Sequence, residues 1–192
     1  MTTVAVIYHT GTGTTGQLAA AITEGINRTG DVQAREYRIL GEDISEGRFI
    51  NHEFLGSAGQ ADALILGSPT YMGGVSAQFK AFADATSDIW SQRKWVNKLA
   101  AGFTIGSSYS GDQLSTIQYL NTFANQHGML WASIDVRSDC ENGVVNRLGA
   151  QSGLIAQTQN SEVHEDDLAM ARHLGTRVAR LTADITMKTG PN

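Results

Sequence analysis

The chain has 192 residues, of which 41% are hydrophobic and 17% charged, and its formal net charge is −5 at pH 7. This length suits one well-buried domain spanning residues 1–192, and the acidic balance, with no run of Lys and Arg, excludes nucleic acid and membrane surfaces as expected partners. No apolar stretch approaches the roughly 20 residues of a membrane helix, and no signal-peptide pattern follows Met1, so the chain is expected to be cytoplasmic.

Strand-like and helix-like segments alternate along the chain, a pattern that predicts a parallel sheet with helices on both faces. Most of the strand-like segments are continuous apolar runs, as central strands require. One is more polar and is expected at a sheet edge, namely Val32–Ile39. The other expected strands are Val4–Tyr8, Ala63–Leu66, Ala101–Ile105 and Met129–Ile134.

The expected helices carry apolar residues at helical spacing, which we interpret as core contacts. The stripes are Leu18, Ile22 and Ile26; Phe79, Phe82, Ala83, Thr86 and Ile89; Leu114, Ile117, Leu120 and Ala124; and Leu168, Ala171, Leu174, Val178 and Leu181. Two stretches, Gly41–Gly59 and Asp139–Ser161, have no clean period. The first is expected to be a long loop or to contain a short helix, and both are candidates for ligand gating or subunit contacts.

The segment after the first strand has the composition of a phosphate-binding loop. In an open parallel sheet, ligands bind beyond the carboxyl ends of the strands, where the strand order changes direction. Glycines allow a phosphate to approach free N–H groups at the start of a helix, and threonine hydroxyls add donors. Such a loop needs no Lys or Arg. The residues are Thr10-Gly11-Thr12-Gly13-Thr14-Thr15-Gly16.

The same loop also matches the dinucleotide pattern G-x-G-x-x-G at Gly11, Gly13 and Gly16, with Glu36 near the place of the expected ribose-binding acid. In dinucleotide folds the first glycine follows the strand almost at once, whereas here the three residues 8–10 intervene. We therefore interpret the loop as a phosphate site of another kind. A dinucleotide site and a purely structural turn are the alternatives.

Two further loops of this kind follow the third and fourth strands. One offers a rigid turn, an aromatic ring, a thioether and backbone amides, in Ser68-Pro69-Thr70-Tyr71-Met72-Gly73-Gly74. Taken alone, it is equally well explained as a turn with Tyr71 and Met72 exposed or capping the core. The other repeats the polar pattern in Gly106-Ser107-Ser108-Tyr109-Ser110-Gly111. Three polar loops at one sheet edge favour a site for a flat ligand that carries a phosphate.

With these loops the sequence resembles the flavodoxin-like NAD(P)H:quinone oxidoreductases first described as tryptophan-repressor-binding proteins. The resemblance runs from Val4 to Leu181 and is most specific in the segments 4–10, 67–79 and 127–129. It implies a flavodoxin-like α/β three-layer sandwich, with a five-stranded parallel sheet in the order 2-1-3-4-5. It also implies FMN as cofactor, NAD(P)H as transient electron donor, a quinone-like acceptor, and a homo-oligomer, either a dimer or a tetramer.

The resemblance further implies roles for individual residues. The FMN phosphate is expected at Thr10, Gly11, Thr12, Gly13, Thr14 and Thr15, and the isoalloxazine at Pro69, Thr70, Tyr71, Met72 and Gly73. Further ring and ribityl contacts are expected from Gly106, Ser107, Ser108, Tyr109 and Ser110. Because the flavin carries the chemistry, no catalytic side chain is expected.

Four positions bear on the substrate and on the assembly. Trp90 stands where the family has a tryptophan beside the substrate cavity, and His127 matches a histidine that approaches the flavin of a neighbouring subunit. Thr12 stands where better-known members carry a tyrosine associated with nicotinamide binding, and Tyr71 where an arginine is common. Thr12, Tyr71 and Trp90 are therefore the candidate substrate contacts.

Some of these features have simpler interpretations. His127 before Gly128 also suits a helix end, where its charge would compensate the helix dipole. Trp90 ends an apolar helical stripe and also suits the core. No metal site is expected. Cys140 is the only cysteine, which excludes a zinc site built on several cysteines. The one cluster of possible metal ligands is better explained as acidic residues in the first turn of a helix, namely Glu162, His164, Glu165, Asp166 and Asp167.

The expected function is two-electron reduction of quinone-like acceptors by NAD(P)H on bound FMN. One alternative is a flavodoxin-type electron carrier, which needs a protein partner rather than a small substrate. The other is a non-catalytic, regulatory FMN-binding protein. The sequence leaves the choice between NADH and NADPH open.

Overall fold

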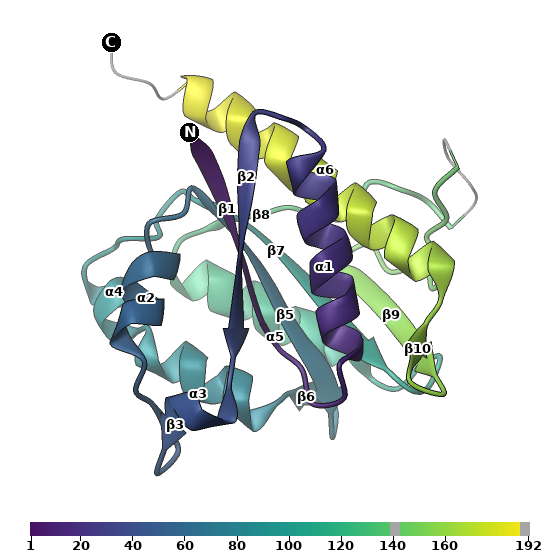
Figure 1. Ribbon diagram of the computed structural model, residues 1–192, viewed down its shortest axis with the longest axis horizontal. Helices are drawn as coiled ribbons and strands as arrows, with labels where there is room; N and C mark the ends of the chain where they lie inside the picture. Colours follow the sequence, from purple (N-terminus) through teal and green to yellow (C-terminus); the bar gives the residue numbers. More distant parts are fainter. Residues whose placement is uncertain (139–142, 189–192) are drawn as a thin grey trace.

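The computed structural model describes residues 1–138 and 143–188, and its framework is a parallel sheet between two layers of helices (Figure 1). The sheet has the order β2-β1-β5-β7-β9, with a short antiparallel β10 (Glu162–Val163) at one edge. The parallel strands are β1 (Thr2–His9), β2 (Val32–Ile39), β5 (Ala63–Tyr71), β7 (Leu99–Gly106) and β9 (Leu154–Gln159). The predicted flavodoxin-like α/β fold and its 2-1-3-4-5 order are confirmed.

The fifth position of the sheet is built differently from the prediction. The strand expected over Met129–Ile134 is reduced to β8 (Leu130–Trp131), which pairs with the start of β7. The second half of β7 pairs with β9 instead. The strand at the fifth position is therefore split, and its longer half lies in the segment without a clean period. The sequence of β9, LIAQTQ, is too polar at its end to form the apolar run that marks a central strand.

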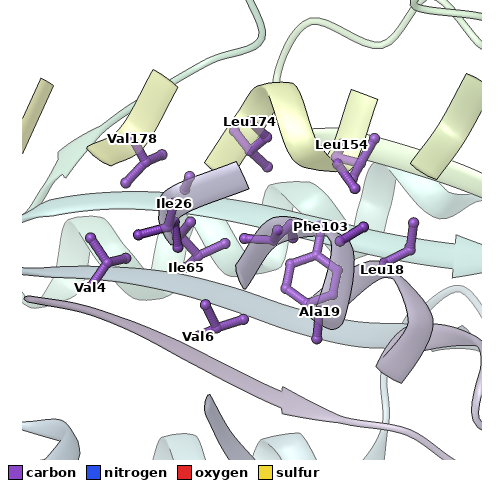
Figure 2. Packing of buried hydrophobic residues seen from close by; sticks show 14 of the residues in the cluster. Val4, Val6, Leu18, Ala19, Ile26, Ile65, Phe103, Leu154, Leu174 and Val178 are labelled. Atoms are coloured by element: carbon purple, nitrogen blue, oxygen red, sulfur yellow. The ribbon is translucent and has the colours of Figure 1, made fainter. Parts of the chain in front are cut away.

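Each face of the sheet has its own helices, because successive side chains of a strand point to opposite faces. Val4 and Val6 of β1 pack with α1 (Thr14–Asn27) and α6 (Glu165–Lys188), as Figure 2 shows. Ala5 and Ile7 pack on the other face. The helices there are α2 (His52–Ala58), α3 (Ala77–Ala85), α4 (Ser87–Ser91) and α5 (Gln113–Gln126).

The predicted apolar stripes are buried, with one clear exception. Leu18, Ile22 and Ile26 of α1 are fully buried, and the stripe of α6 packs between α1 and the sheet. Leu114 is 47% exposed, so its assignment to the core is wrong. It lies in the first turn of α5, beyond the strand ends, where the neighbouring Ser115 donates a hydrogen bond to the carbonyl oxygen of Gly73 in the second loop.

The stretch Gly41–Gly59 contains the short helix α2, one of the two alternatives that its sequence left open. Ahead of α2 lie a 3₁₀ turn, η1 (Gly41–Asp43), and a small hairpin of β3 (Ile44–Ser45) and β4 (Arg48–Phe49). Phe49 and Phe54 anchor this stretch by edge-to-face contacts with each other and with Phe82 of α3. Cys140 lies outside the described residues.

Candidate functional site

The first loop starts α1 without a side-chain cap. Gly13 has φ of +94°, which glycine adopts without strain, and its N–H donates to Thr10 Oγ1 at 3.0 Å. The N–H groups of Thr14, Thr15 and Gly16 donate to no other described residue. Thr15 Oγ1 is buried and also has no partner among the described residues. These free donors at the positive end of the helix dipole form a binding site for an anion.

A buried histidine lies at the base of the first loop. His9 ends β1 and is 7% exposed, and its Nδ1 has no hydrogen-bond partner in the described part of the chain. Burial lowers the pKa of His9, and the charge of Arg38 lowers it further. The imidazole is therefore neutral at pH 7, and the loop holds its free donors without a cationic side chain.

The second loop is a tight β-hairpin rather than an irregular loop. β5 continues through Tyr71 and pairs with β6 (Gly74–Val75), which leaves Met72 and Gly73 as the two turn residues. Both have positive φ, 48° and 76°, as a type I′ turn requires. The side chain of Met72 is fully exposed at the tip, and Tyr71 is 46% exposed beside it.

A small network of threonines supports this hairpin from below. Thr70 Oγ1 lies 2.9 Å from Thr104 Oγ1 of β7 and 2.8 Å from Thr116 Oγ1 of α5. Thr104 Oγ1 in turn donates to the carbonyl oxygen of Ser68 at 2.7 Å. These contacts fix the carboxyl ends of two central strands against the helix that follows the third loop.

The third loop is held by side chains from outside it. Gln113 Nε2 donates to the carbonyl oxygen of Ser108 at 2.6 Å, and Gln157 Nε2 donates to that of Ser107 at 3.1 Å. Tyr109 is 69% exposed and lies 5.9 Å from the guanidinium of Arg147, measured to the ring centre. Arg147 is fixed in turn by an ion pair with the buried Asp167, at 2.6 Å. The backbone of this loop is thus held by α5 and β9, and its Tyr109 side chain is linked through Arg147 to α6.

The structure brings the three loops together at the carboxyl ends of β1, β5 and β7. The phenol of Tyr71 reaches from the second loop to Gly11 of the first, so closely that a Cβ on Gly11 would lie 2.2 Å from Tyr71 Oη. Ser115 joins the second loop to the start of α5, because its hydroxyl is bonded to the carbonyl oxygens of Gly73 and Asp112. The assembled edge offers free N–H groups, hydroxyls and exposed apolar side chains, and the three loops contain no Lys or Arg.

His127 lies apart from these loops. It caps the far end of α5, 11 residues and therefore about 16 Å along the helix from Thr116. It is 4% exposed, its Nε2 lies 2.9 Å from Thr86 Oγ1, and its ring packs against Trp95 and Phe123. Burial lowers the pKa of His127 to about 4. A neutral ring carries no charge for the helix dipole, so the interpretation as a charged helix stop is wrong.

Trp90 is also distant in the fold, on the short helix α4. It is 55% exposed, so its interpretation as a core residue is wrong. Its helix borders a groove of about 720 Å³, which is lined by α2, the β3–β4 hairpin, α3 and α4. The residues that line the groove include none from the three loops, and α4 lies apart from the β5–β6 hairpin (Figure 1).

The acidic group near residue 164 serves the start of α6. Asp167 binds Arg147, and His164 Nδ1 accepts a hydrogen bond from the N–H of Asp166 at 3.2 Å. In residues 1–138 and 143–188, no three His, Cys, Asp or Glu side chains gather in a way that would hold a metal ion. No helix in the same ranges is long and apolar enough to cross a membrane.

The fold is that of a flavodoxin-like protein, and this edge is the candidate ligand site. A family model described as NADPH-dependent FMN reductase matches residues 11–137. A relative from Pseudomonas aeruginosa, named Flavodoxin FldP, is 34% identical over 94% of this chain and 97% of its own length. An NAD(P)H dehydrogenase (quinone) from Chromohalobacter salexigens is 27% identical over 96% of this chain and 99% of its own.

A solved structure agrees with these relatives. It is described as that of the flavodoxin, WrbA-like protein from Agrobacterium tumefaciens. The two sequences are 37% identical, and the match covers 96% of this chain and 99% of the solved one. The TM-score is 0.76. The chain therefore belongs to the NADPH-dependent FMN reductase family of flavodoxin-like oxidoreductases, whose cofactor is FMN.

Proposed function

We propose that this protein passes two electrons from NAD(P)H to a quinone-like acceptor by way of bound FMN. The observation that carries the proposal is the convergence of three loops into one edge that combines an anion site with an open, apolar rim. The rim consists of Tyr71, Met72 and Tyr109, all of them substantially exposed. Small planar molecules have access to such a rim, as hydride transfer from a nicotinamide and to a quinone requires.

In this proposal the first loop binds the FMN phosphate through residues 10–15. The residues present fit a phosphate monoester, because free N–H groups and the buried, unpartnered Thr15 hydroxyl supply donors where cations are absent. Pro69 to Gly73 line the ring. The backbone of Gly106 to Ser110 completes the ring and ribityl contacts, and its N–H groups favour negative charge on the ring.

When bound, FMN supplies the hydride chemistry, and the chain orients it. Thr12 and Tyr71 border the open edge and are the proposed contacts for the nicotinamide and the acceptor. None of the loop residues forms a nucleophile–base pair in the described structure, and the proposed reaction needs none. A quinone-reductase function of this kind is supported by the relatives named NAD(P)H dehydrogenase (quinone).

The test is an anaerobic absorbance spectrum of the FMN-loaded protein during addition of NADH or NADPH. We expect rapid bleaching of the flavin band, followed by recovery when benzoquinone is added. Free FMN at the same concentration is the control for direct reduction. A flavin band that stays unbleached with both nicotinamides would contradict the proposal.

An electron carrier is the second candidate, because the relative named Flavodoxin FldP is 34% identical over nearly the whole chain. A carrier would show two resolved one-electron steps in a redox titration and slow reduction by either nicotinamide. The reductase would show one two-electron step and turnover with quinone. The two functions therefore give opposite results in the same pair of measurements.

We also propose that the protein forms a homo-oligomer. Trp90 and Ile50 expose 55% and 51% of their surfaces near the groove between α2 and α4, an amount that a subunit contact would cover. In this proposal Trp90, which is exposed on α4, meets a flavin only from a neighbouring subunit. His127 is 4% exposed and bonded to Thr86, so in this structure it supports the end of α5 and does not face a neighbouring subunit. Light scattering after size-exclusion chromatography measures the molecular mass of the protein in solution. A monomeric mass at all protein concentrations would contradict the proposed homo-oligomer.

A further inference from the structure

Tyr71 crosses from one loop of the site to another. Its ring leaves the end of β5 and its hydroxyl ends against the backbone of Gly11. A Cβ on Gly11 would lie 2.2 Å from Tyr71 Oη and 3.4 Å from the ring carbon that bears it. Gly11 does not have a positive φ, so its own backbone conformation does not require glycine. What excludes a side chain at position 11 is the hydroxyl of Tyr71.

This hydroxyl is a free donor. Tyr71 Oη makes no hydrogen bond to another described residue, whereas Tyr8 Oη is bonded to Glu36 and Tyr37 Oη to Ser57. The Tyr71 side chain is 46% exposed, so solvent reaches it, yet its hydroxyl is fixed beside the first loop rather than pointing away. A donor in this position lies against Gly11, three residues before the free N–H groups that begin at Thr14.

A second, independent observation concerns a donor in the same loop. The hydroxyl of Thr15 is 99% buried with its residue and has no partner among the described residues. A buried hydroxyl without a partner is costly unless a ligand completes it. The first loop thus has several hydrogen-bond donors without acceptors. A phosphate monoester has three terminal oxygens that can accept from these donors.

We propose that the Tyr71 hydroxyl donates a hydrogen bond to the phosphate of FMN and thereby makes the site selective for FMN over riboflavin. Tyr71 acts as a positioning residue that closes the phosphate end of the site from the second loop. It supplies a neutral donor in a site whose loops offer no cation. The inference rests on FMN binding, and it is independent of the electron donor and acceptor in the proposed reaction.

The test compares two ligands that differ only in the phosphate. Apoprotein is titrated with FMN and with riboflavin, followed by quenching of flavin fluorescence, without nicotinamide or quinone. In Tyr71→Phe we expect FMN affinity to fall about 10-fold and riboflavin affinity to stay within about 2-fold, because only the charged ligand loses its bond. Tyr37→Phe, the same change away from the loops, is the matched control and should alter neither affinity.

Equal losses for both ligands in Tyr71→Phe, or no loss for either, would overturn the proposal. A failed reductase assay would not affect it, because flavin binding is measured alone. Conversely, a normal reductase with an unchanged FMN-to-riboflavin preference in Tyr71→Phe would refute this inference and leave the proposed function in place. Thermal unfolding of each apoprotein shows that the variants are folded.

A double-mutant cycle gives an independent readout. In the wild-type background Gly11→Ala displaces the Tyr71 hydroxyl, so FMN affinity should fall about as far as in Tyr71→Phe. In the Tyr71→Phe background the close contact is gone, and the next atom lies at 3.4 Å, an ordinary contact. The second loss should therefore be much smaller than the first. Equal losses in the two backgrounds would show that the hydroxyl does not act at the first loop.

Discussion

The two ends of α1 differ in how closely they are packed. Toward its carboxyl end, α1 lies so close to α6 that a Cβ on Gly25 would be 2.0 Å from the carbonyl oxygen of Arg172. The reciprocal contact is equally tight, since a Cβ on Gly175 of α6 would be 2.1 Å from the carbonyl oxygen of Ile22 in α1. At its amino end, Gly13 has no atom within 4 Å of its Cβ position, and the N–H groups that follow are free.

The difference shows how a fold keeps unsatisfied donors in place. The packed end fixes the axis of α1 against the sheet and α6, so the open end stays in position without bonds of its own. Positive φ does not distinguish the ligand edge, because Met72 and Asp112 lie beside the site whereas Glu46, Arg93 and Asn160 have the same feature in other turns. The free N–H groups at the start of α1 do lie at the ligand edge, where a bound anion compensates for them.

The largest expected effect comes from disturbing the packed end. Gly175→Ala should lower the free energy of unfolding by about 3 kcal/mol, because the atoms that the new methyl meets are backbone atoms of α1 and cannot rotate away. Urea unfolding of the apoprotein measures it. The control is Gly56→Ala in α2, where nothing lies within 4 Å and alanine should stabilise the helix by about 0.5–1 kcal/mol. If both variants changed the free energy of unfolding in the same direction, the proposed close contact between α1 and α6 would be contradicted.

The second prediction concerns how the stability of the protein depends on pH through His127, which is buried at the carboxyl end of α5. The pKa of His127 is lowered to about 4, below its ordinary value of 6.5, so the unfolded state takes up a proton first as the pH falls. Stability should therefore decrease from pH 6.5 to about 4, with no further loss from this group below that. We expect a loss of about 3 kcal/mol over this range.

The control for this pH effect is His127→Phe, which has no proton to gain. Its stability should be lower at pH 7, because Thr86 loses its partner, but its decrease between pH 6.5 and 4 should be smaller than that of the wild type. His9, whose pKa is also lowered, remains in both proteins and does not affect the difference. Parallel pH profiles would contradict a buried, neutral His127.

The sequence predicted those elements whose residue pattern has a single structural explanation. The apolar runs of β1 and β7 and the stripe Leu18, Ile22, Ile26 gave the sheet and α1, because such periods arise only from burial. The hairpins were missed, because their turns are Glu46-Gly47, Met72-Gly73 and Asn160-Ser161 rather than the usual Asn-Gly or Asp-Gly. The position of β9 was missed because its sequence, LIAQTQ, lacks the continuous apolar run of a central strand.

The candidate site shows the same division. Glycine and threonine density predicted the three loops, whose meeting depends only on the direction of parallel strands. The reach of Tyr71 to Gly11 and the link of Ser115 to Gly73 depend on side-chain directions that no local pattern encodes. The exposure of Trp90 and the burial of His127 depend on how α4 and α5 end, which a helical stripe does not determine.

The third prediction separates stability from binding at the open end of α1. Thr15→Val replaces a buried hydroxyl that has no partner in the described chain by a methyl of similar size. The apoprotein should gain about 1 kcal/mol of stability, whereas FMN affinity should fall about 10-fold, because the ligand loses a donor. Urea unfolding and fluorescence titration measure the two changes. Thr23→Val, at another buried hydroxyl without a partner, is the control, with a gain in stability and unchanged FMN affinity.

The smallest expected effect concerns the strained turn at the rim. Met72 has φ of 48° at the first position of a type I′ turn, where asparagine is favoured, so Met72→Asn should stabilise the apoprotein by about 0.5 kcal/mol. If its thioether borders the acceptor, as proposed, the KM for benzoquinone should rise about 3-fold with kcat nearly unchanged, a loss of about 0.7 kcal/mol in binding.

The reverse change is available in the β9–β10 hairpin, where Asn160 has φ of 53° at the matching position of its turn. Asn160→Met should lose about as much stability as Met72→Asn gains, without a change in KM, because the hollow that Asn160 lines includes Tyr109 but neither Tyr71 nor Met72. A rise in KM in both variants would mean that the effect comes from the turn backbone in general. A rise in Met72→Asn alone would show that the site edge retains an unfavourable residue for its contact with the acceptor, which is the trade-off that the two ends of α1 display.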